Sequence, residues 1–204
     1  MFDWDSMKNK IILADNKDIM KDIPDKFFEL AIVDPPYKDD LSGLNVGINR
    51  NFKYSEFKSP NKNYFKELFR ISKNQIIWGG NYFIEHLKNT DGFICWYKHQ
   101  NGHFSECELA WTNIGKGKFF DRAYQRDIGN KIHPTQKPIA LYRWLLQNYA
   151  KPNDKIIDTH SGSGSCAIAC HLEKFEFLAI EKDEDYYKAS VKRLEEIRSQ
   201  GVLF

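Results

Sequence analysis

Residues 30–37 read LAIVDPPY, four apolar residues followed by an aspartate, two prolines and a tyrosine. The apolar run predicts a short buried strand of an α/β sheet. Neither Pro35 nor Pro36 can donate a backbone hydrogen bond to a sheet, so the strand must end at Asp34. Ligand crevices in α/β sheets open where the strands end. The stretch therefore predicts a carboxylate that is aimed out of the sheet into a ligand site.

A second strand and a glycine-rich turn follow far downstream. Residues 155–165 read KIIDTHSGSGS, which predicts a strand ending at Asp158, a turn, and a helix that continues to Glu173. Glycine permits positive φ angles and lets a ligand approach the backbone closely. Glu181 follows the next apolar strand, about where an acidic residue meets a ribose diol. The pattern predicts a nucleotide-type cofactor, with S-adenosylmethionine (SAM) and a nicotinamide dinucleotide as rival ligands.

A third motif precedes this turn, since residues 133–138 read HPTQKP and a helical pattern follows. The three motifs together resemble those of the DNA amino-methyltransferases, which methylate adenine at N6 or cytosine at N4. Their order, with DPPY before the glycine motif, is similar to that of the permuted group called the β class. SAM is favoured over a nicotinamide because the turn lacks the third glycine of the pyrophosphate fingerprint, an acid precedes the turn, and DPPY has no role in hydride transfer.

The resemblance covers nearly the whole chain, and it implies a fold, a cofactor and a set of site residues. The implied fold is the α/β, Rossmann-like fold of SAM-dependent methyltransferases, with a doubly wound, seven-stranded mixed sheet. The implied cofactor is SAM, with no metal ion. The implied catalytic residues are Asp34, Pro35, Pro36 and Tyr37. The implied cofactor-binding residues are Asp15, Asp34, His133, Thr135, Lys137, Asp158, His160, Gly162, Gly164, Ser165 and Glu181.

Two features depart from the family pattern. The family usually carries Pro and Phe after the aspartate of its glycine motif, whereas this chain has Thr159 and His160. The wall that faces SAM is then expected to be polar and titratable, with weaker or pH-dependent cofactor binding. The segment between the two halves is also short, so we expect one catalytic domain, 1–204, without a separate target-recognition domain. The candidate DNA-contacting segments are the loops 38–63 and 113–132, in which basic residues outnumber acidic ones.

Composition sets the remaining bounds. A chain of 204 residues, of which 42% are hydrophobic, is long enough for one sizeable core. The formal net charge is only +2, so whole-molecule charge does not by itself indicate a nucleic-acid protein. No apolar run reaches the length of a membrane span, and we expect a cytoplasmic protein that has no membrane partner. Cys95, His99, His103 and Cys107 recur every four residues, but their surroundings predict two strands and a turn in place of a metal-binding helix.

The apolar runs and 3.6-residue patterns predict seven strands with helices between them. The strands are expected near residues 10–14, 30–34, 74–79, 92–97, 107–112, 155–158 and 177–181. The helices are expected near residues 62–72, 80–88, 136–149, 164–173 and 183–198.

The resemblance predicts transfer of a methyl group from SAM to N6 of an adenine that is flipped out of DNA, in a restriction–modification or related setting. Asp34 favours adenine, because serine is commoner there in cytosine-N4 enzymes. The partner is DNA, and a homodimer is possible because dimers are common in this family. The alternatives are cytosine N4, an RNA or protein-amide substrate, and a non-catalytic partner subunit that binds SAM or DNA.

Overall fold

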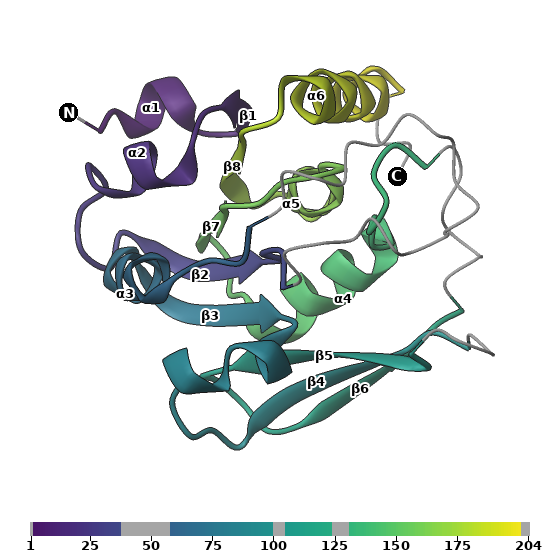
Figure 1. The fold of residues 1–204 in the computed structure, drawn as a ribbon. Helices are drawn as coiled ribbons and strands as arrows, with labels where there is room; N and C mark the ends of the chain where they lie inside the picture. Colours follow the sequence, from purple (N-terminus) through teal and green to yellow (C-terminus); the bar gives the residue numbers. More distant parts are fainter. Residues whose placement is uncertain (1, 38–57, 100–104, 124–130, 201–204) are drawn as a thin grey trace.

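The computed structural model describes residues 2–37, 58–99, 105–123 and 131–200, and these are built around one mixed β-sheet (Figure 1). Eight strands form this sheet in the described part of the chain, in the order β1-β8-β7-β2-β3-β5-β4-β6. The strands are β1 (Lys10–Leu13), β2 (Phe28–Val33), β3 (Ser72–Trp78), β4 (Gly92–Tyr97), β5 (Cys107–Thr112), β6 (Lys118–Asp121), β7 (Lys155–Asp158) and β8 (Glu176–Glu181). The helices are α1 (Trp4–Met7), α2 (Asn16–Met20), α3 (Lys62–Ile71), α4 (Ile139–Tyr149), α5 (Ser165–Leu172) and α6 (Glu184–Ser199).

The strand directions place the predicted motifs at one edge of the sheet. Strands β1, β8, β7, β2 and β3 are mutually parallel, and β5 is antiparallel to both of its neighbours, β3 and β4. The chain leaves β7 toward β8 but leaves β2 toward β3, so the order reverses between β7 and β2. Ligands of open α/β sheets bind at such a reversal, beyond the carboxyl ends of the strands.

Helices cover both faces of the parallel part of the sheet. Alternate residues of β2 point to opposite faces, with Leu30 and Ile32 in one core and Ala31 and Val33 in the other. Helices α4, α5 and α6 cover the first face, and α1, α2 and α3 lie over the second (Figure 1). These two layers confirm the α/β, doubly wound architecture. None of the helices in the described ranges is long and apolar enough to cross a membrane.

The number of strands and one helix were predicted wrongly. Strand β6, at the edge of the sheet, was missed because its four residues are mostly exposed and lack a buried apolar face. The helix expected at 80–88 is two short 3₁₀ turns, η1 (Gly80–Tyr82) and η2 (Ile84–His86). Phe83, between the two turns, has φ −119° and ψ 19°, which is outside helical geometry, so no continuous helix runs through this segment. Helices α1 and α2 are only four and five residues long and follow the capping side chains of Asp3 and Asp15.

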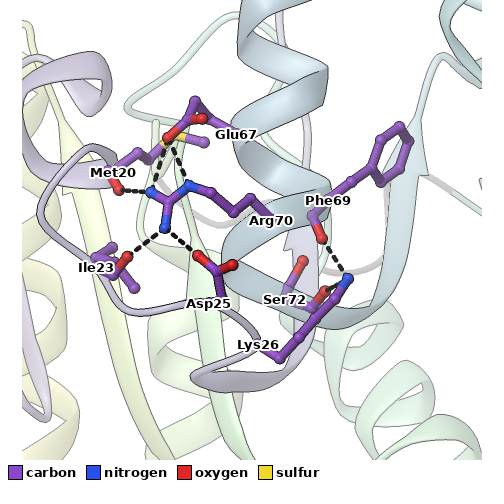
Figure 2. Close-up of polar contacts among 8 residues, drawn as sticks. All are labelled: Met20, Ile23, Asp25, Lys26, Glu67, Phe69, Arg70 and Ser72. Atoms are coloured by element: carbon purple, nitrogen blue, oxygen red, sulfur yellow. Dashed lines mark hydrogen bonds and ion pairs between the residues drawn. The ribbon is translucent and has the colours of Figure 1, made fainter.

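One arginine anchors α3 to the loop that precedes β2 (Figure 2). The Arg70 guanidinium donates to the carbonyl oxygens of Met20 and Ile23 at 2.7 and 2.6 Å. It also donates to the carboxylates of Glu67 and Asp25. Beside it, the ammonium of Lys26 donates to the carbonyl oxygens of Phe69 and Ser72 at the end of α3. These donors tie the loop before β2 to the end of α3, and at the Met20 carbonyl the guanidinium adds to the hydrogen bond from the backbone N–H of Ile23.

Arg70→Met should lower the free energy of unfolding by about 1–3 kcal/mol, because it removes the side-chain donor of the Ile23 carbonyl group and one of the two donors of the Met20 carbonyl group. Urea denaturation followed by circular dichroism measures this. The control is Lys73→Met, since the Lys73 side chain is 52% exposed and its ammonium lies 2.9 Å from the Glu29 carboxylate. That change should stay within about 0.5 kcal/mol, and an equal loss in both variants would contradict the anchoring role.

Candidate active site

A cavity of about 630 Å³ opens where the parallel strands end. Its wall includes Asp34 after β2, Gly79 after β3, Thr159 after β7 and Glu181 at the end of β8. The volume lies in the range of roughly 300–1,000 Å³ that is usual for small-molecule sites. The sheet thus brings together residues that are far apart in the sequence.

The most buried charge in this cavity is the ammonium of Lys137, whose side chain is 2% exposed. Its Nζ lies 2.6 Å from Oδ2 of Asp34 and 5.3 Å from the centre of the Trp78 ring. The other carboxylate oxygen, Oδ1 of Asp34, is buried and has no hydrogen-bond partner among the described residues. One oxygen of Asp34 is therefore held, and the other is left as a buried acceptor within the cavity wall.

Two further charged residues complete this group and were not predicted from the sequence. Lys137 also lies 3.1 Å from Oε2 of Glu108, and the ammonium of Lys98 lies 3.0 Å from Oε1 of the same carboxylate. Glu108 stands opposite Trp96 in the antiparallel pair β4–β5. The signal available in the sequence was positional: Lys98 continues the inward-facing series of Ile94 and Trp96, where a charge is unusual.

The charges of this group determine one another's ionisation. Burial opposes the charge of Lys137, but the carboxylates of Asp34 and Glu108 outweigh it and raise the pKa of the ammonium. Burial raises the pKa of Asp34, and Lys137 opposes that rise. Burial also acts against the Glu108 carboxylate, but Lys137 and Lys98 hold its pKa below its ordinary value. The group therefore contains a firmly cationic Lys137 between two acids.

An aromatic pair lies at another part of the wall. The rings of Tyr37 and Tyr82 are stacked, with centroids 4.6 Å apart and planes 7° from parallel. A Cβ atom on Gly79 would lie 2.5 Å from the Tyr37 ring, so a glycine is required where the ring packs. Tyr82 is 52% exposed. The pair presents an aromatic surface to the cavity.

The glycine turn and Glu181 form the opposite part of the cavity. The Glu181 carboxylate accepts hydrogen bonds from the backbone N–H groups of Gly162 (2.7 Å) and Asp183 (2.9 Å). The His133 ring lies over the turn, at 3.5 Å from the position that a Cβ on Gly162 would take. The hydroxyl of Ser161 is buried without a hydrogen-bond partner among the described residues. This part of the site offers a carboxylate and a hydroxyl to a polar ligand.

Comparison with known proteins gives the family. A family model described as "DNA methylase" matches residues 103–192. The protein named "Putative methylase YubD" of Escherichia coli (strain K12) is 33% identical over 215 residues, which cover 91% of this chain and 90% of that protein. The chain belongs to the N6/N4 family of DNA methylases.

Solved structures share the fold of this methylase. The M1.HpyAVI–SAM complex aligns with a TM-score of 0.63 and 22% identity, covering 91% of this chain and 98% of that one. The PvuII DNA methyltransferase, described as cytosine-N4-specific, aligns with a TM-score of 0.65 and 12% identity, covering 94% and 91%. At these identities the likeness concerns the fold, and it confirms the α/β methyltransferase fold that was expected.

Most of the predicted site residues of the methylase line the cavity. Those that do are Asp15, Asp34, Pro35, Pro36, Tyr37, His133, Thr135, Lys137, His160, Gly162 and Glu181. Within this set, the Asp15 side chain caps α2 by accepting from the N–H of Lys17. Lys137, which is predicted to bind the cofactor, lines the cavity with its ammonium in contact with the carboxylates of Asp34 and Glu108.

Three residues predicted to bind the cofactor do not line the cavity. Asp158 is buried beneath the turn, and its Oδ1 accepts from the backbone N–H of His160 at 3.0 Å. Gly164, with a φ of 72°, begins α5 where a side chain would meet Ile11 and Ser190 at 3.1 Å. The hydroxyl of Ser165 accepts from Arg193. These residues shape the turn from behind.

The expected titratable wall at Thr159 and His160 is corrected by the structure. The His160 ring contacts Asn16 at 3.1 Å and Thr159 at 3.0 Å, and the Thr159 hydroxyl lies 2.7 Å from that of Tyr64. Burial lowers the pKa of His160 to about 3. Burial and the nearby Lys137 likewise lower the pKa of His133 to about 3. Both rings are therefore neutral near neutral pH, and the wall is polar without titrating there.

The candidate DNA-contacting loops are only partly described. Residues 38–57 and 124–130 lie outside the described residues, so the predictions there are not followed further. Lys58 lines the cavity. Lys118 instead lies against α4, since its ammonium donates to Asn148 and lies 5.3 Å from the centre of the Tyr149 ring. Cys95 and Cys107 lie on the paired strands β4 and β5, as predicted, and not on a helix.

Asp158 predicts a pH dependence of stability. Burial raises its pKa to about 8, whereas an unfolded aspartate has a pKa of about 3.9. The folded state must therefore hold a proton that the unfolded state has released, and this group destabilises the fold increasingly as pH rises from about 4 to 8.

Asp158→Asn removes that titration and keeps the acceptor for the N–H of His160. Its free energy of unfolding, measured by urea denaturation at pH 5 and pH 8, should fall less over that interval than that of the wild type. Asp91→Asn, at an exposed aspartate, serves as control. An unchanged difference between the two pH values in Asp158→Asn would show that Asp158 is ionised in the folded protein.

Proposed function

We propose that this methylase transfers a methyl group from SAM to the exocyclic N6 of adenine in a base flipped out of DNA. The observation that carries the proposal is the state of Asp34: Lys137 holds one of its oxygens, and the other is a buried acceptor within the cavity wall without a partner in the described chain. Family membership supports a DNA substrate.

The residues at the glycine turn fit SAM. Glu181 is a carboxylate at the cavity wall, where a ribose diol can donate to it. The positive φ of Gly162 lets a ligand approach the backbone closely. The unpartnered Ser161 hydroxyl gives a further polar contact. When bound, SAM supplies an electrophilic methyl group on a sulfonium.

Asp34 and the chain beside it would orient the base. An adenine amino group has two N–H bonds, and its lone pair is delocalised into the ring. Oδ1 of Asp34 accepts one N–H and the backbone carbonyl of Pro35 accepts the other, which turns the nitrogen toward the methyl group. The two acceptors would also stabilise the positive charge that develops on nitrogen, and the nitrogen would become neutral again when one N–H proton passes to Oδ1 of Asp34 or to water.

Tyr37 and Tyr82 would receive the flipped base. Extruding a base costs a few kcal/mol of lost stacking and pairing, and stacking on an aromatic side chain returns about 1–3 kcal/mol. Tyr37 was expected to stack on the base, and in this structure one of its faces is occupied by Tyr82. A base that stacks on that face of Tyr37 must first displace the Tyr82 ring.

Asp34 supports adenine as the base, since serine is commoner at this position in cytosine-N4 enzymes. The fold does not separate the two, because the cytosine-N4-specific PvuII enzyme shares it. Asp34 also disfavours a protein-amide substrate, since enzymes that act on glutamine more often carry asparagine there. A restriction–modification role and a homodimer belong to the same proposal.

Methyl transfer can be tested with tritiated-methyl SAM and unmethylated duplex DNA, followed by digestion and separation of the nucleosides. Label should appear in N6-methyldeoxyadenosine. Label in N4-methyldeoxycytidine would show that the methylated base is cytosine and not adenine. Label only in a parallel RNA reaction would reject DNA as the substrate.

Asp34→Ala should lower the methyl-transfer rate by about 10²-fold or more, because it removes an acceptor that acts on the reacting nitrogen. SAM binding, measured by calorimetry, should persist and shows that the variant is folded. Asp91→Ala is the control. Retention of more than about a tenth of the activity, which corresponds to a rise in the barrier of less than about 1.4 kcal/mol, would remove Asp34 from the mechanism.

Glu181→Ala should weaken SAM binding by about 1–3 kcal/mol, because the ribose would lose a buried charged acceptor. Calorimetry of the purified variant measures the loss. Glu176→Ala is a matched control, since Glu176 lies at the other end of the same strand, outside the cavity. Equal affinities in both variants would place the ribose elsewhere.

A further inference from the structure

The proposed mechanism uses Asp34 but leaves an ion pair beside it unexplained. Lys98 and Glu108 lie 3.0 Å apart on the paired strands β4 and β5, and Glu108 also contacts Lys137 at 3.1 Å. The side chain of Lys98 is 9% exposed. Removing two charges from water costs several kcal/mol of desolvation free energy, so a buried ion pair of this kind often adds little to the stability of the fold. Because Glu108 and Asp34 share the Lys137 ammonium, stability alone does not explain the pair, and a role in positioning Asp34 is the alternative.

We propose that Glu108 and Lys98 are positioning residues for Asp34: Glu108 shares the Lys137 ammonium and so keeps Asp34 oriented, and Lys98 offsets the charge of Glu108 and so keeps Asp34 ionised. This inference rests on the proposed function, in which Asp34 accepts a hydrogen bond from the amino group that is methylated. It assigns neither residue a contact with the reacting atoms.

Orientation follows from how the Lys137 ammonium is shared. It approaches Oδ2 of Asp34 at 2.6 Å and Oε2 of Glu108 at 3.1 Å. With two acids holding the ammonium, it stays on Oδ2 and leaves Oδ1 open. If Glu108 were neutral, Asp34 would be the ammonium's only carboxylate partner among the described residues, and both of its oxygens would compete for the same donor.

Ionisation follows from the number of charges. Two carboxylates and two ammonium groups make a neutral set, whereas the loss of Glu108 leaves one extra positive charge and the loss of Lys98 one extra negative charge. An extra positive charge opposes both protonation of Asp34 and the positive charge that develops on the amino nitrogen. An extra negative charge favours protonation of Asp34.

Among the described residues, the other titratable groups that act on this set are two tyrosines, a histidine, a lysine and an aspartate, and the variants tested below leave them unchanged. Tyr37, after β2, and Tyr142, on α4, are phenols whose pKa values burial raises. His133, before α4, is neutral near neutral pH, and burial lowers the pKa of Lys131 to about 8. Asp158, at the end of β7, has a pKa of about 8 and adds to the negative potential when it is ionised.

The test compares four variants of the full chain: Glu108→Gln, Lys98→Met, Lys98→Arg and the double variant Lys98→Met with Glu108→Gln. Carboxyl ¹³C labelling of aspartate lets the titration of Asp34 be followed by NMR, with its signal assigned by its loss in Asp34→Asn. Glu29→Gln with Lys73→Met removes a pair far from the cavity and serves as control.

We expect Asp34 to titrate at lower pH in Glu108→Gln and at higher pH in Lys98→Met, with the double variant returning to the wild-type value. Lys98→Arg, which keeps the charge, should titrate as the wild type does. Unchanged titration of Asp34 in both single variants, or shifts in the same direction, would overturn the proposal and leave the pair a structural link between strands.

Kinetics supply the second measurement. In Glu108→Gln, kcat should fall about tenfold, equivalent to about 1.4 kcal/mol, with KM for DNA within about threefold of the wild type, because binding contacts are retained. In Lys98→Met, the acid limb of the pH profile of kcat should shift to higher pH. A rise in KM alone would contradict positioning of Asp34.

Two design features keep the test decisive. If Glu108→Gln does not fold, the comparison of Lys98→Met with Lys98→Arg decides alone, since equal behaviour of those two variants overturns the proposal. If the wild type methylates neither DNA nor RNA, the proposed function fails, while the NMR titration still reports whether Glu108 and Lys98 control Asp34.

Discussion

The parallel pairing of β2 with β7 is the constraint on which the site depends. Leu30 stands opposite Ile156 and Ala31 opposite Ile157, with all four side chains buried. This register brings residues separated by more than 120 positions to one edge of the sheet, with the DPPY carboxylate beside the glycine turn. A shift by one residue would exchange the faces of the strand, sending Leu30 and Ile32 to the wrong core. The packing of the two cores therefore fixes the relative position of the two motifs.

A second constraint is that the buried carboxylates and ammonium groups of the site balance one another's charge. Asp34, Lys137, Glu108 and Lys98 come from the end of β2, the segment before α4, the start of β5 and the end of β4. Each ammonium has a carboxylate neighbour, and Lys137 has two. Because an unpaired buried charge costs several kcal/mol, these segments must all be in place before the set is stable. The set of charges is therefore complete only when three strand ends and the segment before α4 are all in place.

The sequence indicated much of the fold, because buried parallel strands are continuous apolar runs. It did not indicate β6, whose exposed residues depend on β4 for pairing, or the break at Phe83, where the backbone leaves helical geometry within a helical pattern. Within the site, Asp34 and Glu181 were predicted from motifs and line the cavity. The contact between Lys98 and Glu108 depends on the register of two strands, which no motif records. Asp158 was predicted on the cavity wall but lies beneath it, because the turn that follows folds back over its side chain.

The reversed direction of β5 has a consequence for how this fold can vary. Strand β5 is antiparallel to β4, so the first residues of β5 lie beside the last residues of β4. The two ends of the β4–β5 connection therefore lie at the cavity. Lys98 closes the base of this hairpin twice, through its N–H to the carbonyl of Glu106 at 2.8 Å and through its ammonium to Glu108. Because Lys98 makes both contacts, the ends of β4 and β5 are held together where the connection begins. These two contacts lie between the connection and the buried charges, so we infer that the length of the connection can change with little effect on the position of Glu108.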